Sequence, residues 1–120
     1  MTRPARVVAV TGSAGLVAFQ LALAAGAPWG ALAWGGQHPG VLPRELRAGS
    51  AFSAAVWAVA FAAAAHPGEG ARLTKVRTAY ASVCAVGAVM NAASPSTPER
   101  LLWTPVSGAL AVGFWRLRRR

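Results

Sequence analysis

Hydrophobic residues fill four long stretches of the chain, and charged residues gather between them. The stretches without Asp, Glu, Lys or Arg run from Val7 to Pro43, Ala48 to Gly68, Thr78 to Pro98 and Leu101 to Trp115. The second stretch has no polar face, and a helix that is apolar all round must be buried in protein or in lipid. At 1.5 Å per residue, the 20 residues of Leu46–Ala65 span the roughly 30 Å hydrocarbon core of a bilayer.

The pattern therefore predicts an all-α fold, a four-helix transmembrane bundle made of two hairpins, in one membrane domain over residues 1–120. The predicted spans cover about residues 7–26, 46–65, 74–93 and 100–116. Turns rich in Pro and Gly at residues 66–70 and 94–98 separate them. We expect Pro43 at the first position of the second helix and Thr97 as the N-cap of the fourth.

Residues 27–36 are too few and too rich in glycine to span a membrane. Their tryptophans, Trp29 and Trp34, suit an interfacial segment, because indole rings favour the head-group level. With Trp103 they predict a Trp-rich extracytoplasmic cap over the bundle.

Charge and composition change this picture little. Charged residues make up only 12% of the chain, against roughly 25% in soluble domains. The alternative is a soluble, Ala-rich bundle, but a domain of this size buries only about two-thirds of its unfolded surface. It would not hide four uncharged helices.

The net charge of +9 raises the alternative of a nucleic-acid-binding protein. The charges lie in short clusters between apolar stretches, so membrane topology explains them better, and we expect no nucleic-acid partner. The C-terminal arginines suit anionic lipid head groups. If both termini are cytoplasmic, nine Lys and Arg residues lie inside and three outside. The prediction is a multi-pass plasma-membrane protein with cytoplasmic termini, in which Arg72, Lys75 and Arg77 extend outward from the third helix.

The first apolar stretch leaves a second interpretation open. Arg3, Arg6 and the small residues near Ala27 resemble a cleaved secretory signal. The apolar stretch exceeds the usual signal length and contains Gln20, so we predict a retained helix. A repeat of the two hairpins is a further open alternative.

Few residues suggest catalysis, so we predict no enzyme activity and no cofactor. Cys84 is the single cysteine and excludes an intramolecular disulfide. His38 and His66 fall on opposite faces of the predicted membrane, which argues against a histidine metal or haem site. No acidic residue is expected deep in the membrane, where proton-coupled transport needs one.

Polar and aromatic residues gather instead near the predicted outer face. The candidate ligand- or partner-binding residues are Gln20, Trp29, Trp34, His38, Arg44, Glu45, Asn91, Glu99, Arg100 and Trp103. The alternative is that they are helix caps, interface anchors and surface ion pairs.

Two sharper predictions follow from these candidates. Glu45 or Glu99 should pair with an arginine of the other hairpin. Gln20 and Asn91 should both turn inward and find partners, because a carboxamide facing lipid is costly. They would form either an interhelical bond or the polar floor of a pocket roofed by tryptophans.

The segments GAPWGALAWGG, HPGVLP, NAASPS and LWTPV cover about a third of the chain with neighbouring residues. They resemble small four-span integral membrane proteins of unknown function that are common in high-GC actinobacteria. The resemblance implies a fold but no activity and no site.

The first functional hypothesis is a non-enzymatic membrane protein that binds a protein partner or a small ligand at its extracytoplasmic face. The alternative is a small oligomeric channel or transporter, which would need at least a dimer because four short helices leave little room for a pore. Its expected partners are the lipid bilayer and either further copies of the chain or another membrane protein.

Overall fold

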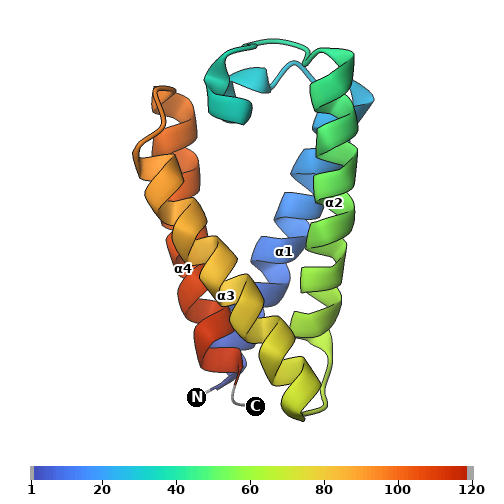
Figure 1. Ribbon diagram of the computed structural model, residues 1–120, viewed down its shortest axis with the longest axis vertical. Coiled ribbons are helices and arrows are strands. Elements are labelled where there is room, and N and C mark those ends of the chain that lie inside the picture. The colour runs from blue at the N-terminus through green and yellow to red at the C-terminus, as the bar shows by residue number, and fades with distance from the viewer. Residues whose placement is uncertain (1, 119–120) are drawn as a thin grey trace.

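The computed structural model describes residues 2–118 and contains four long helices in that range. The helices are α1 (Thr2–Ala25), α2 (Arg44–Ala65), α3 (Ala71–Ala92) and α4 (Thr97–Leu117). Two short 3-10 turns, η1 (Gly30–Leu32) and η2 (Trp34–Gly36), lie between α1 and α2 (Figure 1). No strand occurs within residues 2–118. The prediction of an all-α fold with four helices is confirmed.

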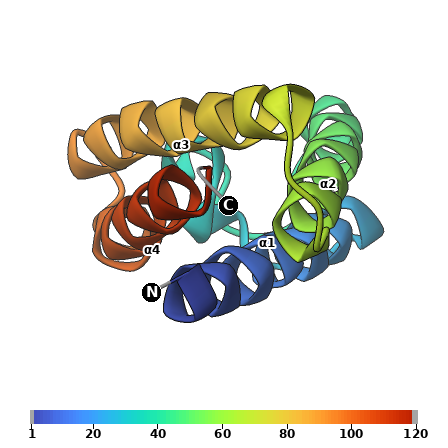
Figure 2. The same cartoon turned by 90° about the horizontal axis from the view of Figure 1, so that it is seen from below.

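The helices form two antiparallel hairpins that meet at one end. α1 packs along α2, α3 packs along α4, and α1 also contacts α4, whereas α2 and α3 touch much less. Figure 1 shows the hairpins converging near the chain termini and diverging toward residues 26–43. Seen from below, α1 lies opposite α3 and α2 lies opposite α4 (Figure 2). The longest dimension of the molecule is 41 Å.

Two helix starts differ by one residue from the sequence prediction. Ser96, not Thr97, is the N-cap of α4, and its hydroxyl accepts a hydrogen bond from the Glu99 backbone N–H at 3.3 Å. Pro43 precedes α2 as its N-cap instead of occupying its first position. Both caps have extended backbone angles, which suit the residue before a helix.

Arg77 is the largest fully buried side chain of the described chain, at 1% exposure. Its guanidinium donates to the backbone oxygens of Ala63 at 3.0 Å, His66 at 2.9 Å and Leu117 at 3.3 Å. The prediction that Arg77 extends outward is therefore wrong. The last carbonyls of a helix lack donors within the helix and carry partial negative charge, so they draw the cation inward.

Other arginines also donate hydrogen bonds to backbone carbonyls near helix ends. Arg6 donates to Ala64 at 2.7 Å, next to the contacts of Arg77. Arg47 donates to the Ala24 carbonyl at the end of α1, at 3.1 Å. Arg100 donates to the Ser94 carbonyl just beyond α3, at 2.8 Å. Each helix thus has an arginine from another segment at its C-terminal end.

The main hydrophobic core lies in the half of the bundle where the hairpins meet. Its buried members are Ala5, Ala9, Ala60, Ala64, Ala81, Cys84, Leu110, Phe114 and Leu117. A smaller cluster of Leu23, Ala33 and Leu42 lies at the other end. The small residues of the main core, among them five alanines, allow the helix backbones to approach closely.

Residues 26–43, called here the bridging segment, connect the outer ends of α1 and α2 (Figure 1). The Gly30 backbone N–H donates to the Gly40 carbonyl at 2.9 Å, which closes the segment into a compact loop. A Cβ atom at Gly30 would lie 1.8 Å from the His38 carbonyl oxygen. Only glycine permits this approach.

Two of the helices are long and apolar enough to cross a membrane. Arg3–Ala25 reaches a mean hydropathy of 1.9 and Arg44–Ala65 reaches 1.6. These two are the helices of the first hairpin.

Candidate functional site

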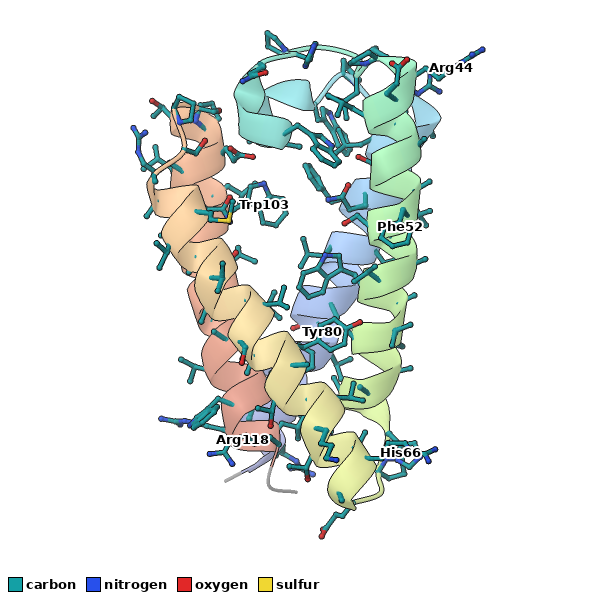
Figure 3. The ribbon with its side chains drawn as sticks, viewed as in Figure 1. Arg44, Phe52, His66, Tyr80, Trp103 and Arg118 are labelled. Carbon is teal, nitrogen blue, oxygen red and sulfur yellow. The ribbon has the colours of Figure 1, made fainter. Side chains whose placement is uncertain are left out.

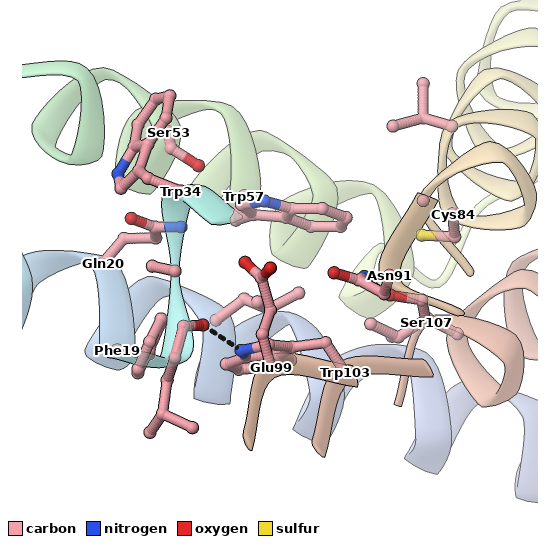
Figure 4. Close-up of a pocket in the computed structure, with 16 residues that line it drawn as sticks. Phe19, Gln20, Trp34, Ser53, Trp57, Cys84, Asn91, Glu99, Trp103 and Ser107 are labelled. Carbon is pink, nitrogen blue, oxygen red and sulfur yellow. Dashed lines mark hydrogen bonds between the residues drawn. The ribbon is translucent and has the colours of Figure 1, made fainter. Parts of the chain in front are cut away.

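A cavity of about 290 Å³ lies between the two hairpins, beneath the bridging segment. It is lined by Leu16, Phe19, Gln20, Leu32, Ala33, Trp34, Ser53, Trp57, Val83, Cys84, Gly87, Asn91, Glu99, Trp103, Ser107 and Leu110. Figure 4 shows this lining, with aromatic rings and a few polar groups facing a common space. Residues from all four helices and from the bridging segment contribute.

Helical spacing explains why these residues converge. On α4, Glu99, Trp103 and Ser107 are four residues apart and therefore share one face. On α3, Gly87 and Asn91 follow Cys84 at intervals of three and four residues. Both faces belong to the second hairpin, so they form one wall of the cavity, and residues of α1 and α2 line it from the first hairpin.

The bridging segment is fixed over the cavity by hydrogen bonds to both hairpins. The Trp103 indole N–H donates to the Leu32 carbonyl at 2.6 Å, shown as a dashed line in Figure 4. On the other side, the Trp34 indole N–H donates to the Ser50 hydroxyl of α2 at 3.1 Å. Two tryptophans thereby anchor the segment through their polar edges and leave their apolar rings to the cavity.

Glu99 joins the bridging segment to α4. It is 8% exposed, one carboxylate oxygen accepts the Gly35 backbone N–H at 3.3 Å, and the other accepts the Ser94 hydroxyl. Figure 4 shows its carboxylate pointing into the space between Trp57, Gln20 and Asn91. The expectation that no acidic residue is buried is therefore wrong for Glu99.

The predicted ion pair between hairpins does not form within residues 2–118. Glu99 does reach the other hairpin, but its partner there is the Gly35 N–H. Arg100 turns instead toward Ser94 and Thr97, and Arg47 turns toward the end of α1. Backbone carbonyls and the Thr97 hydroxyl accept hydrogen bonds from these arginines, so the Glu99 carboxylate has only neutral donors among residues 2–118.

Gln20 and Asn91 both face the cavity, as predicted. Asn91 donates through its side-chain nitrogen to the Ser107 hydroxyl of α4 at 3.1 Å, which satisfies part of the prediction. The Gln20 side-chain oxygen is buried and has no hydrogen-bond partner among residues 2–118. The expected partner for Gln20 is therefore missing from the described chain.

Aromatic contacts close the two ends of the cavity. At the outer end, the Phe19 ring lies edge-on to Trp103, with 4.8 Å between ring centroids. At the inner end, Trp57 contacts Tyr80 at 5.8 Å, and the Tyr80 hydroxyl donates to the Val56 carbonyl at 2.6 Å. Tyr80 thus ties α3 to α2, and it points between the hairpins in Figure 3.

The structure brings five of the ten candidate residues into the cavity: Gln20, Trp34, Asn91, Glu99 and Trp103. Trp29 stacks on the far side of the lining against Phe19, with centroids 6.3 Å apart, and does not roof the cavity. His38, Arg44, Glu45 and Arg100 also lie outside its lining. Figure 3 shows Arg44 pointing away from the bundle and Trp103 pointing into it.

Several cavity residues escaped the sequence analysis. The main ones are Phe19, Ser53, Trp57, Cys84 and Ser107. Ser50, Ser53 and Trp57 fall on one face of α2 at helical spacing, which was the available signal. The signal was weak because apolar residues surround it on every other face.

The lining suits binding better than metal chemistry. Within residues 2–118, no group of three or more His, Cys, Asp or Glu side chains comes together as a metal site. The cavity lining instead contains three indole rings, one carboxylate and two carboxamides. A mostly apolar, half-enclosed space with a few directed polar groups is typical of a small-molecule site. A scan against protein-family models finds no match, and neither does a search of curated proteins or of solved structures.

Proposed function

We propose that this chain is a multi-pass membrane protein that binds a small ligand in the cavity between its hairpins, on the extracytoplasmic side of the bilayer. The observation that carries this proposal is the buried Gln20 oxygen, which faces the cavity without a partner in the described chain. A buried acceptor that stays unpaired costs about 1–3 kcal/mol. A ligand that donates a hydrogen bond to it would recover that energy.

Membrane insertion of all four helices is supported by the outer surface of the bundle. Large apolar side chains are exposed on every helix, among them Leu21 and Phe52 on the first hairpin and Val89 and Leu101 on the second. Phe52 is 73% exposed and Val89 is 71% exposed. Soluble monomers rarely expose extended apolar surfaces, and lipid would cover this one.

Orientation follows from the positive charges. Arg6, Arg72, Lys75, Arg116 and Arg118 lie at the end where the hairpins meet, which Figure 1 shows as the start of α1, the start of α3 and the end of α4. The positive-inside rule assigns that end to the cytoplasm and the bridging segment to the outside. Trp115, with Arg118 3.6 Å from its ring centroid, would mark the inner head-group level.

The binding proposal is tested with two small probes of the same shape, neutral 3,3-dimethylbutan-1-ol and charged choline. The purified protein is titrated in detergent by calorimetry. Gly87→Leu should abolish saturable binding, because a Cβ at Gly87 points into open space at the cavity wall, 3.8 Å from the Ser107 hydroxyl.

The matched control is Gly15→Leu, which adds the same side chain to an exposed position on α1 with nothing within 4 Å. It should leave binding unchanged. Absence of saturable binding of both probes to the unmodified protein, or binding that survives Gly87→Leu, would contradict the proposal.

Transport remains a second candidate function, and buried Glu99 is the observation that favours it. Proton- or cation-coupled transporters carry an ionisable group of this kind within the membrane domain. Uptake of labelled choline into proteoliposomes, faster than into empty liposomes, would support transport. Binding without uptake would leave the binding function alone.

A further inference from the structure

We infer that the ligand of this cavity is a small organic cation, an ammonium group with apolar substituents, held by the Glu99 carboxylate and by the indole rings of Trp34, Trp57 and Trp103. This inference rests on the proposed binding function and names its ligand class. Three observations carry it: the state of the carboxylate, the aromatic lining and the absence of a protein counter-charge.

The hydrogen bonds of Glu99 suit its ionised form. Both of its oxygens accept hydrogen bonds, one from the Gly35 N–H and the other from the Ser94 hydroxyl. An ionised carboxylate is an acceptor only, whereas a protonated one must place its own hydrogen. The site can therefore accommodate a negative charge at the cavity wall.

Among residues 2–118, no positive side chain is hydrogen-bonded to this carboxylate. Glu99 has neutral partners only, and the nearest arginine in sequence, Arg100, donates to the Ser94 carbonyl and the Thr97 hydroxyl. A buried charge without a partner of opposite sign is costly. The chain has a net charge of +9 and only three acidic residues, and Glu99 is the acidic residue that lines the cavity. A cationic ligand supplies the missing counter-charge.

The aromatic lining selects an organic cation over a metal ion. Cations bind the faces of aromatic rings, tryptophan best, and cages of such rings recognise quaternary ammonium groups. Trp34, Trp57 and Trp103 line the cavity with Phe19, and Figure 4 shows Trp57 and Trp103 on either side of the Glu99 carboxylate in that view. Calcium and magnesium would instead need six or more oxygen ligands, which one carboxylate among apolar walls does not supply.

The remaining polar groups fit the other end of such a ligand. Gln20 presents an unpartnered acceptor to the cavity. A ligand with a hydroxyl or N–H group a few atoms from its ammonium group could donate to Gln20 while the cation faces Glu99. Choline has both features, which makes it a suitable probe.

The test compares choline with 3,3-dimethylbutan-1-ol, in which a carbon atom replaces the charged nitrogen. Unmodified protein should bind choline at least about tenfold more tightly than the neutral alcohol, as desolvated cation–π contacts and a carboxylate together imply. Glu99→Gln should reduce this preference to the part contributed by the indole rings, because its amide oxygen can still accept the Gly35 N–H while the charge is lost. Affinity for the neutral alcohol should stay the same.

Glu45→Gln is the matched control, since Glu45 is exposed at the start of α2 and outside the cavity lining. It makes the same change in net charge and should keep the preference for choline. A second pair tests the rings: Trp57→Leu should weaken choline binding more than alcohol binding, whereas Trp115→Leu, on the exposed surface, should change neither.

Each outcome has a clear meaning. Equal affinity for both probes in unmodified protein would overturn the cation inference and leave the binding function standing. A preference for choline that is undiminished in Glu99→Gln would overturn the assignment of Glu99. Absence of binding of both probes would overturn the binding function itself. Thermal unfolding of every variant shows whether a loss of binding reflects a loss of the fold.

Discussion

Several arginine side chains in this protein donate hydrogen bonds to the backbone carbonyls at the C-terminal ends of helices. Arg77 alone contacts the ends of two helices, α2 and α4, through three backbone carbonyls. Its planar guanidinium presents several donors in a fixed fork, which a lysine cannot reproduce. A positive charge near an apolar stretch can therefore be a buried structural residue.

Replacing Arg77 should destabilise the bundle strongly. Arg77→Leu removes the arginine donor from the Ala63 and Leu117 carbonyls, whereas the His66 carbonyl keeps Arg6 as a donor. We expect the free energy of unfolding to fall by roughly 2–4 kcal/mol, since hydrogen bonds to charged groups contribute about 1.5–3 kcal/mol each and partly relax on loss. Thermal unfolding in detergent measures the change. Arg77→Lys should restore only part of it.

Arg72→Leu is the control for that experiment, because Arg72 is exposed on the same helix and removes the same charge. It should change stability by less than about 0.5 kcal/mol. Equal effects of the two substitutions would show that Arg77 acts through its charge alone.

The two carboxamides of the cavity should differ in their effect on stability. Asn91→Leu breaks the bond to Ser107 and should cost roughly 0.6 kcal/mol, the average for such bonds in membranes. Gln20→Leu removes an unpaired buried acceptor and should leave stability unchanged or raise it. Thermal unfolding of the single and double variants measures both.

The two effects should add in the double variant, because Gln20 and Asn91 share no hydrogen bond. Ligand binding should weaken with either change. A marked loss of stability from Gln20→Leu would instead indicate a structural partner for Gln20.

At the scale of elements, the bridging segment decides whether the cavity exists. The second 3-10 turn of this segment, η2, has positive φ angles at all three of its residues. The φ angle is 54° at Trp34, 74° at Gly35 and 72° at Gly36. This left-handed backbone is strained for a bulky residue such as Trp34. In this conformation the Trp34 ring faces the cavity and its indole N–H donates a hydrogen bond to the Ser50 hydroxyl.

Gly30→Ala should open the outer end of the cavity. The added Cβ would collide with the His38 carbonyl, so the loop must shift away from α4. Cys84 reports this change, since it lines the cavity and is 3% exposed. We expect N-ethylmaleimide to modify Cys84 several-fold faster in this variant, measured by mass spectrometry.

Gly40→Ala serves as the control, because nothing lies within 4 Å of a Cβ added there. Its rate of Cys84 modification should match that of the unmodified protein. The same slow rate in Gly30→Ala would mean that the bridging segment does not control access to the cavity.

At the scale of the whole molecule, the hairpins are joined at both ends and held apart between them. Arg77 of α3 joins the hairpins near the chain termini through the Ala63 carbonyl of α2, and Trp103, Trp34 and Glu99 join them at the opposite end through the bridging segment. α2 and α3 contact each other much less than the two helices within each hairpin do.

Topology follows from the distribution of charge, and reporter fusions test it. Alkaline phosphatase fused after Gln37, in the bridging segment, should be active, because that segment is predicted to be extracytoplasmic. Fused after Gly70, in the turn between the hairpins, it should be inactive. The reverse pattern would invert the proposed orientation and place the cavity on the cytoplasmic side.

The sequence by itself determined the helices. Long apolar stretches between Pro- and Gly-rich turns allow little else, because backbone groups in such stretches must bond within their own helix. Candidate site residues such as Gln20, Asn91 and Trp103 were also accessible, since carboxamides and indoles are conspicuous among alanines and valines.

Only the tertiary structure decided which partners these residues have. Glu99 and Arg100 are neighbours in the sequence, yet one turns into the cavity and the other caps α3. Arg77 looked like a surface anchor until two helix ends met beside it. Trp57 lines the cavity because α2 and α3 lie apart in the folded structure. Such pairings depend on contacts between residues far apart in the chain, and helical periodicity carries no information about where two hairpins cross.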